Sequence, residues 1–254
     1  MMNFSKLAKQ YQNELLNNVI PFWLNKSQDK EFGGYFTCFD GQGNIFDTDK
    51  FIWLQGREVW MFSTLYNKVE KKQEWLDCAI QGAEFLKKYG HDGEFNWYFS
   101  LTREGKPLIE PYNIFSYTFA AMAFGQLSLA TGNQEYEQIA KATFDKILSK
   151  KENPKGKWNK VHPGTRDLKN FALPMILSNL ALEIEHLLDE KFLLQTLENI
   201  THEILEVFYR PELGIVVENV TLTNELSDSF DGRLVNPGHA LEAMWFLMDV
   251  GERL

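Results

Sequence analysis

The 254-residue sequence has little cysteine, little histidine and no run of basic residues. Two cysteines, Cys38 and Cys78, are too few for a disulfide framework and lack the spacing of metal ligands, so we expect reduced thiols. The net charge of −9 makes nucleic acid and anionic membrane surfaces poor partners. The longest apolar stretch, about 119–130, contains Gln126 and is too short to cross a bilayer, and the N-terminus lacks an apolar signal core. Together these absences favour a soluble, cytoplasmic protein.

The scarcity of histidine also argues against a metal site. No two histidines have metal-ligand spacing on one helix, so no zinc site is expected. Four of the five are expected to be surface residues, namely His91, His162, His186 and His202. The fifth, His239, lies in a different setting and is treated below.

Apolar and aromatic residues are plentiful, at 44% and 14% of the chain. This content supports one large core, and the rings either fill that core or line a carbohydrate pocket. The hydrophobic spacing predicts mostly helix, with the segments at about 4–26, 53–69, 73–89, 112–131, 134–149, 170–187, 190–208 and from 237 onward. Short strand-like segments flank Gly-containing turns at 41–44 and 103–105, and GIVVENV (214–220) is a further predicted strand.

A weak internal repeat indicates stacked helical hairpins. The helix starts EWLDCA, EYEQIA and KFLLQT place Trp75, Tyr136 and Phe192 about 60 residues apart, a period of two helices plus a loop. No Pro-rich or low-complexity linker divides the chain. We therefore expect one all-α domain over residues 1–254, with a little over four hairpins and short β-hairpins in the loops.

His239 is the best candidate for a catalytic base. It lies in GRLVNPGHALEAMWFL at the first turn of an apolar helix, after a predicted Asn236 cap and Pro237. The positive end of the helix dipole disfavours a protonated imidazole and so favours a neutral base. Glu242 follows three residues later on the same face and could orient the imidazole or bind a hydroxyl. A capping arrangement around a buried histidine explains the same residues equally well.

Two further polar residues lie within apolar helical segments. Arg57, in KFIWLQGREVWMF, would be costly to bury without an acid or an oxygen-rich ligand, and the adjacent Glu58 does not face it. Asn179, in FALPMILSNLALEIE, needs hydrogen-bond partners that either a neighbouring helix or a sugar could supply.

Six segments in order resemble the N-acylglucosamine 2-epimerases, also known as renin-binding proteins. The segments are EFGGYFTCFDGQGN, KFIWLQGREVWMFSTLYN, IFSYTFAAMAF, FALPMILSNL, VVENVT and GRLVNPGHALEAMWFL, and they run almost end to end through the chain. The resemblance implies an (α/α)6 barrel and epimerisation at C2 between N-acetylglucosamine and N-acetylmannosamine. It also implies a homodimer, no cofactor in catalysis, and ATP as an allosteric activator; the sequence has no P-loop.

The same resemblance assigns roles to individual residues. His239 matches one of two catalytic histidines that act on opposite faces of the ring-opened sugar, through an enolate intermediate. Arg57 and Glu242 match substrate-binding residues. Asn179 stands where the related cellobiose epimerases have histidine, which favours the N-acylglucosamine branch.

The second catalytic histidine of the family lies near the C-terminus, and none of the other four histidines here matches its motif. We therefore expect a chain truncated at the C-terminus, a fragment covering roughly the first four hairpins, inactive as an epimerase and prone to self-association. Two alternatives remain: an aldose–ketose isomerase or cellobiose 2-epimerase of the same fold, and a non-catalytic binding protein.

Overall fold

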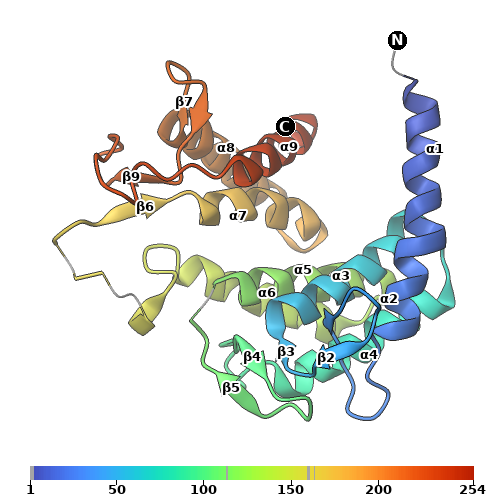
Figure 1. Ribbon diagram of the computed structural model, residues 1–254. Coiled ribbons are helices and arrows are strands. Elements are labelled where there is room, and N and C mark those ends of the chain that lie inside the picture. Colours follow the sequence, from blue (N-terminus) through green and yellow to red (C-terminus); the bar gives the residue numbers. More distant parts are fainter. Residues whose placement is uncertain (1–2, 113, 159–160, 163) are drawn as a thin grey trace.

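Helices dominate the computed structural model, which describes residues 3–112, 114–158, 161–162 and 164–254 (Figure 1). The α-helices are α1 (Phe4–Glu14), α2 (Ile20–Lys26), α3 (Ile52–Lys68), α4 (Gln73–Tyr89), α5 (Ile114–Thr131), α6 (Gln134–Ser149), α7 (Ala172–Glu183), α8 (Glu190–His202) and α9 (Pro237–Arg253). A π-helical turn at Leu15–Val19 joins α1 to α2, and another at Glu203–Phe208 extends α8. Single 3-10 turns lie at Gly156–Trp158 and Glu185–Leu187.

The strands are short, antiparallel and confined to the connections between helices. β1 (Cys38–Phe39) pairs with β2 (Ile45–Asp47), and β3 (Lys50–Phe51), β4 (Ser100–Leu101) and β5 (Pro107–Ile109) form a three-stranded sheet. β6 (Leu168–Asn170) pairs with β9 (Asn219–Thr221), and β7 (Tyr209–Arg210) with β8 (Ile215–Val216). The predicted hairpins around 41–44 and 103–105 are thereby confirmed.

Two predicted segments differ in detail from the structure. The helix expected from residue 170 begins at Ala172, because Asn170 ends strand β6 and its Oδ1 accepts a hydrogen bond from the Ala172 amide. The predicted strand 214–220 is two strands, β8 and β9, with different partners. Between them, the carbonyl of Glu218 accepts from the Phe171 amide and the Glu218 amide donates to the Leu234 carbonyl.

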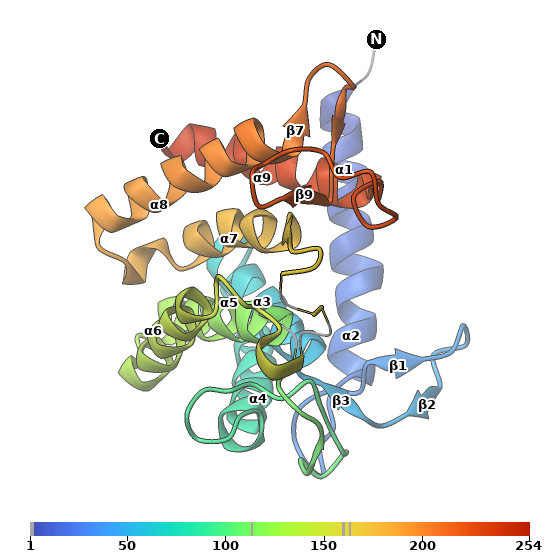
Figure 2. The same cartoon turned by 90° about the vertical axis from the view of Figure 1, so that its left-hand side faces the viewer.

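The helices alternate between an inner and an outer row. Every residue of α5 from Ser116 to Ser128 is buried, and α5 packs against α3, α4, α6 and α7. By contrast, α4, α6 and α8 each bury one face and leave the other to solvent, as expected for amphipathic outer helices. The inner row is α3, α5, α7 and α9, and the outer row is α1–α2, α4, α6 and α8 (Figures 1 and 2). This is the expected α/α-barrel arrangement, and the part of the chain that the structure describes forms an arc of four outer–inner pairs.

The inner helices run parallel to one another. Near the start of α3, Gly56 lies against the Phe119 backbone of α5, and near its end the Asn67 Nδ2 donates to the Gln126 carbonyl at 2.9 Å. The C-terminal end of α7 joins this bundle, because the carboxylate of Glu183, its last residue, accepts a hydrogen bond from Trp60 Nε1 of α3 at 2.8 Å. Arg253, at the end of α9, likewise reaches Glu185 beyond the end of α7 at 2.7 Å. The N-terminal ends of all four inner helices therefore lie on one side of the arc, and their C-terminal ends lie on the opposite side.

A buried ionic cluster fixes the first outer–inner pairs. Lys50 is fully buried and donates to the Asp29 carboxylate at 3.1 Å and to the Arg103 carbonyl at 2.8 Å. The Arg103 guanidinium makes two further bonds to Asp29, at 2.9 and 3.0 Å. Burial acts to raise the pKa of the Asp29 carboxyl, but the bonds from Arg103 and Lys50 outweigh it and hold that pKa at about 2. The cluster joins the loop before β1 to β3 and to the β4–β5 turn.

Glu58 is buried in the core on the side of α3 that faces α2. Its carboxyl accepts a hydrogen bond from the Ser27 hydroxyl, and it makes no ion pair with any described residue. Burial raises the pKa of Glu58 to about 8, against the opposing effect of the Ser27 bond. Glu58 is therefore protonated at neutral pH, and it makes no ion pair with its neighbour Arg57.

Gly56→Ala is expected to destabilise the fold. An added methyl group would lie 2.8 Å from the Phe119 carbonyl, so α3 and α5 must separate. Overpacking of this kind costs about 1–3 kcal/mol, more than the gain of about 1 kcal/mol from the better helix former. Urea unfolding measures the change. Gly41→Ala is the control, because nothing lies within 4 Å of its added methyl group. Equal stability of the two variants would contradict the close approach of α3 and α5.

Glu58→Gln is expected to stabilise the protein, and increasingly so at higher pH. The folded chain holds the Glu58 proton up to about pH 8, whereas the unfolded chain releases it near the ordinary value of 4.5. Wild-type stability should thus fall between these values, and the glutamine variant should avoid that loss, by about 1 kcal/mol or more at neutral pH. Unfolding at a series of pH values measures this difference, with the exposed Glu94→Gln as control. A pH-independent difference between Glu58→Gln and wild type would show that Glu58 is ionised in the folded state.

Candidate active site

His239 lies in the first turn of α9. The predicted cap is confirmed: Asn236 Oδ1 accepts from the amides of Gly238 at 3.1 Å and His239 at 3.4 Å, and Pro237 is the first helical residue. The side chain of His239 is 33% exposed, so part of it remains open to solvent.

Glu218 holds the imidazole of His239. The Nδ1 atom lies 3.0 Å from each oxygen of the Glu218 carboxylate. Glu218 is only 4% exposed, and its carbonyl and amide groups are bonded to Phe171 and Leu234. The β6–β9 pairing extends this anchoring, since Asn170 lies opposite Asn219. A buried carboxylate, held through its backbone, therefore fixes the orientation of the ring.

This geometry determines which nitrogen can act on a substrate. When Nδ1 carries its proton toward the carboxylate, the lone pair of the neutral imidazole is on Nε2, the nitrogen that makes no bond to Glu218. The carboxylate also stabilises the ring once Nε2 has taken up a proton, which offsets the unfavourable field of the helix N-terminus. The pair can thus accept a proton, hold it and return it.

Sequence reasoning missed Glu218 and favoured Glu242 as the acid that could orient the imidazole. Glu242 is half-buried, one turn after His239 on α9, and its carboxylate makes no hydrogen bond with the described residues. Its predicted role of binding a hydroxyl stays a prediction. A signal for Glu218 was present: it is the one charged residue in the apolar stretch GIVVENV, where a buried charge requires a partner.

Arg57 is not buried, although its position in an apolar segment suggested a buried side chain. Its side chain is exposed on α3, with the guanidinium carbon 4.5 Å from the ring centre of Phe119 and 5.7 Å from that of Trp53. The guanidinium makes cation–π contacts with these rings, and no described carboxylate pairs with it. The guanidinium N–H groups remain available to oxygen atoms of a ligand.

Asn179 is half-buried near the middle of α7, and its amide makes no hydrogen bond to the described residues. A structural bond to a neighbouring helix, the alternative interpretation from sequence, is therefore not seen. An amide in this position needs polar partners from solvent or from a ligand.

The predicted site residues all lie on inner helices, but they do not form one bonded cluster. The structure brings His239 together with Glu218, and it places Glu242 and Asn179 on α9 and α7, which pack side by side. Arg57 lies two inner helices away from α7, stacked on α5.

The remaining histidines lie elsewhere. His186 contacts Ser128 at the C-terminal end of α7, the end opposite to His239, and His91 packs against Phe95 and Trp97 after α4. His162 and His202 are exposed, in a loop and at the end of α8.

No group of three or more His, Cys, Asp or Glu side chains among the described residues is arranged to hold a metal ion. No helix in the same part of the chain has the length and apolar character to cross a membrane.

Sequence comparison relates the chain to one family. The profile of the N-acylglucosamine 2-epimerase (GlcNAc 2-epimerase) family matches residues 34–254. The N-acylglucosamine 2-epimerase of Bos taurus is 36% identical over 245 residues, and that of Rattus norvegicus 36% over 255 residues. These matches cover 92% and 96% of this chain but only 57% and 60% of the relatives. The chain thus spans less than two thirds of their length. The cellobiose 2-epimerase of Bacteroides fragilis is 29% identical over 56% of this chain.

Solved structures share the fold. The cellobiose 2-epimerase of Bacillus thermoamylovorans B4167 matches with a TM-score of 0.83 and 20% identity, covering 98% of this chain and 67% of that one. A D-mannose isomerase matches with a TM-score of 0.71 and 14% identity, covering 96% of this chain and 71% of that one. At these identities the similarity concerns the fold alone.

Glu218, rather than Glu242, is expected to set the tautomer of His239. In the wild-type chain at alkaline pH, ¹⁵N spectra of the imidazole should show the proton on Nδ1, because the carboxylate accepts it. Glu218→Ala should mix the two tautomers, whereas Glu242→Ala should leave the spectrum unchanged. The reverse pattern would assign the orienting role to Glu242.

Proposed function

The chain belongs to the N-acylglucosamine 2-epimerase family, and we propose that it carries the proton-abstracting part of an enzyme that interconverts N-acetylglucosamine and N-acetylmannosamine. The observation that carries the proposal is the contact between buried Glu218 and Nδ1 of His239. This contact leaves Nε2 as an oriented base in the first turn of α9.

The proposed chemistry is a proton transfer at C2 of the ring-opened sugar. Nε2 of His239 takes the C2 proton, and the electron pair of the broken C–H bond forms the enolate, whose negative charge rests on the former carbonyl oxygen. Glu218 stabilises the imidazolium while it holds the proton. The guanidinium of Arg57 supplies donors for an oxygen on which charge develops, and Asn179 and Glu242 bind polar groups of the sugar.

Inversion requires the proton to return on the opposite face of C2. Among the described histidines, His239 is the one whose ring contacts the buried Glu218, whereas His186 lies at the far end of α7. We therefore assign to the chain one proton transfer, at one face of C2, and assign no residue to the other face.

The amino sugar is favoured over a disaccharide by the extent of the sequence matches. The curated N-acylglucosamine 2-epimerases match over 92–96% of this chain, whereas the cellobiose 2-epimerases match over 56% of it. Three further expectations stay with this proposal and rest on the family resemblance or on composition: ATP as an allosteric activator, a homodimer for the longer protein, and a cytoplasmic location.

Deuterium uptake at C2 tests the proposed function. In D2O, with N-acetylglucosamine and N-acetylmannosamine supplied separately, we expect one epimer to exchange its C2 hydrogen without net conversion, because one base reaches one face. His239→Gln should slow the exchange about a hundredfold or more, and Glu218→Gln about 10–100-fold. His202→Gln, at an exposed position on α8, is the control. Exchange that survives His239→Gln would refute the assignment, and exchange of cellobiose alone would move the chain to the disaccharide branch.

Arg57→Lys is expected to lower the C2 exchange rate without lowering stability. Lysine keeps the charge but loses the planar fork and much of the contact with the Phe119 ring, so we expect about a tenfold or greater loss. Because Arg57 is exposed, the melting temperature should stay close to that of wild type. A variant that melts early, with normal exchange by the folded fraction, would assign Arg57 a purely structural role.

A further inference from the structure

A long loop separates Glu218 from His239. The two residues are 21 positions apart, and residues 222–236 between them, all of which the structure describes, form no helix or strand. Along 222–235 only Gly232 is buried, and Phe230 is 87% exposed. Because the loop buries so little apolar surface, hydrophobic packing does not fix its position. Hydrogen bonds must therefore set the path that leads from Glu218 to the first turn of α9.

Residues 227–234 of this loop fold into one compact unit, the Gly232 turn. The Ser229 hydroxyl accepts a hydrogen bond from the Gly232 amide at 3.0 Å, and the Ser229 carbonyl accepts one from the Arg233 amide at 3.0 Å. A methyl group on Gly232 would overlap the Ser227 carbonyl, so the turn closes too tightly for any side chain there. The unit therefore keeps its own shape, and its position depends on its bonds to the rest of the fold.

Two hydrogen bonds attach the Gly232 turn to the segment that holds Glu218. The Glu218 amide donates to the Leu234 carbonyl at 3.2 Å, and Asn219 Nδ2 donates to the Asp231 carbonyl at 2.9 Å. The first is a backbone bond, which any residue except proline could make at position 218. Only the second bond depends on the identity of a side chain, that of Asn219.

The oxygen of the Asn219 amide is bonded as well. Its Oδ1 accepts from Asn170 Nδ2 at 3.0 Å, and the same Nδ2 lies 3.3 Å from the Glu218 carbonyl. Asn170 Oδ1 in turn accepts from the Ala172 amide at the start of α7. Because both ends of each amide are bonded, the orientation of the two side chains is fixed. The two amides thus form a chain of hydrogen bonds that joins α7, Glu218 and the Gly232 turn.

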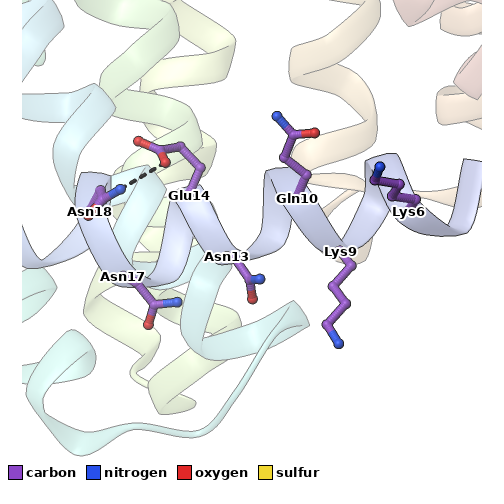
Figure 3. Close-up of a pocket in the computed structure, with 7 residues that line it drawn as sticks. All are labelled: Lys6, Lys9, Gln10, Asn13, Glu14, Asn17 and Asn18. Carbon is purple, nitrogen blue, oxygen red and sulfur yellow. Dashed lines mark hydrogen bonds between the residues drawn. The ribbon is translucent and has the colours of Figure 1, made fainter.

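The asparagines of α1 make no such connection between segments. Figure 3 shows Asn17 and Asn18 on the exposed polar side of α1, where Asn18 bonds to Glu14 of the same helix, one turn away. The bond between Asn170 and Asn219 instead joins residues 49 positions apart. A bond within one helix stabilises that helix locally, whereas a bond over this range constrains how distant segments meet.

We propose that Asn219 is a positioning residue, which sets the contact between His239 and Glu218. Its amide holds the Gly232 turn beside Glu218, and this turn leads directly to Asn236, which caps α9 and so places the imidazole. Asn219 makes its own bonds to other groups and acts on the imidazole only through the turn. The effect expected on C2 exchange rests on the proposed function, whereas the effect on the imidazole does not.

The tautomer of His239 measures this positioning without relying on catalysis. In ¹⁵N spectra at alkaline pH, we expect Asn219→Leu, which loses both bonds, to mix the two tautomers. Asn219→Asp keeps an acceptor but loses the donor to the Asp231 carbonyl, so it should give the same result, and it serves as the test if Asn219→Leu does not fold. C2 exchange should slow about tenfold with KM nearly unchanged, because Asn219 is not proposed to bind the sugar.

Lys169→Met is the matched control. Lys169, next to Asn170 on β6, donates to Asn224 of the same loop at 2.7 Å, so its loss leaves the Gly232 turn attached. It should keep the wild-type tautomer, and melting curves check that each variant is folded. The proposal is overturned if a folded Asn219 variant keeps the Nδ1-protonated form, or if Lys169→Met mixes the tautomers equally. Mixed tautomers in the Asn219 variants, with no C2 exchange by the wild type, would support the positioning role and refute the proposed function.

Discussion

The parallel course of the four inner helices is the constraint on which the site depends. Polar contacts hold the inner helices together at both helix ends. Glu183 and Arg253 make such contacts at the C-terminal ends, and the β6–β9 pairing lies at the N-terminal ends of α7 and α9. Because the helices are parallel, the unsatisfied amides of their first turns and the loops that precede them lie together on one side of the arc. Of the residues proposed to contact a sugar, His239 lies at this N-terminal end, in the first turn of α9.

Adjacent positions on α3 show how strongly environment controls charge in this fold. Arg57 and Glu58 follow one another in sequence, yet the first stacks on aromatic rings at the surface and the second is buried beside Ser27. Because consecutive residues of an α-helix do not face each other, the two side chains point in different directions. The acid is protonated at neutral pH and makes no ion pair with the guanidinium, whose N–H groups face no described carboxylate.

Much of the fold could be predicted from sequence because its signals are local. Apolar periodicity identified the helices, Asn236 and Pro237 identified the start of α9, and Gly-containing turns identified two hairpins. The site was less accessible because its contacts join distant segments. Glu218 reaches His239 across the β9–α9 connection, and the surroundings of Arg57 depend on Phe119 of another helix. Neither contact leaves a periodic pattern, although a lone glutamate among valines was a usable sign of a buried carboxylate.

The buried Lys50 cluster has a consequence for how the chain folds. In linear repeat proteins each unit contacts only its neighbours, and stability spreads along the array in small increments. Here Lys50 cannot be desolvated until Asp29 and Arg103, from segments far apart in the chain, have both arrived. Opening either segment would leave a buried charge of the cluster without its partner. The first two outer–inner pairs should therefore form and unfold as one cooperative unit, and their amide protons should exchange together rather than helix by helix.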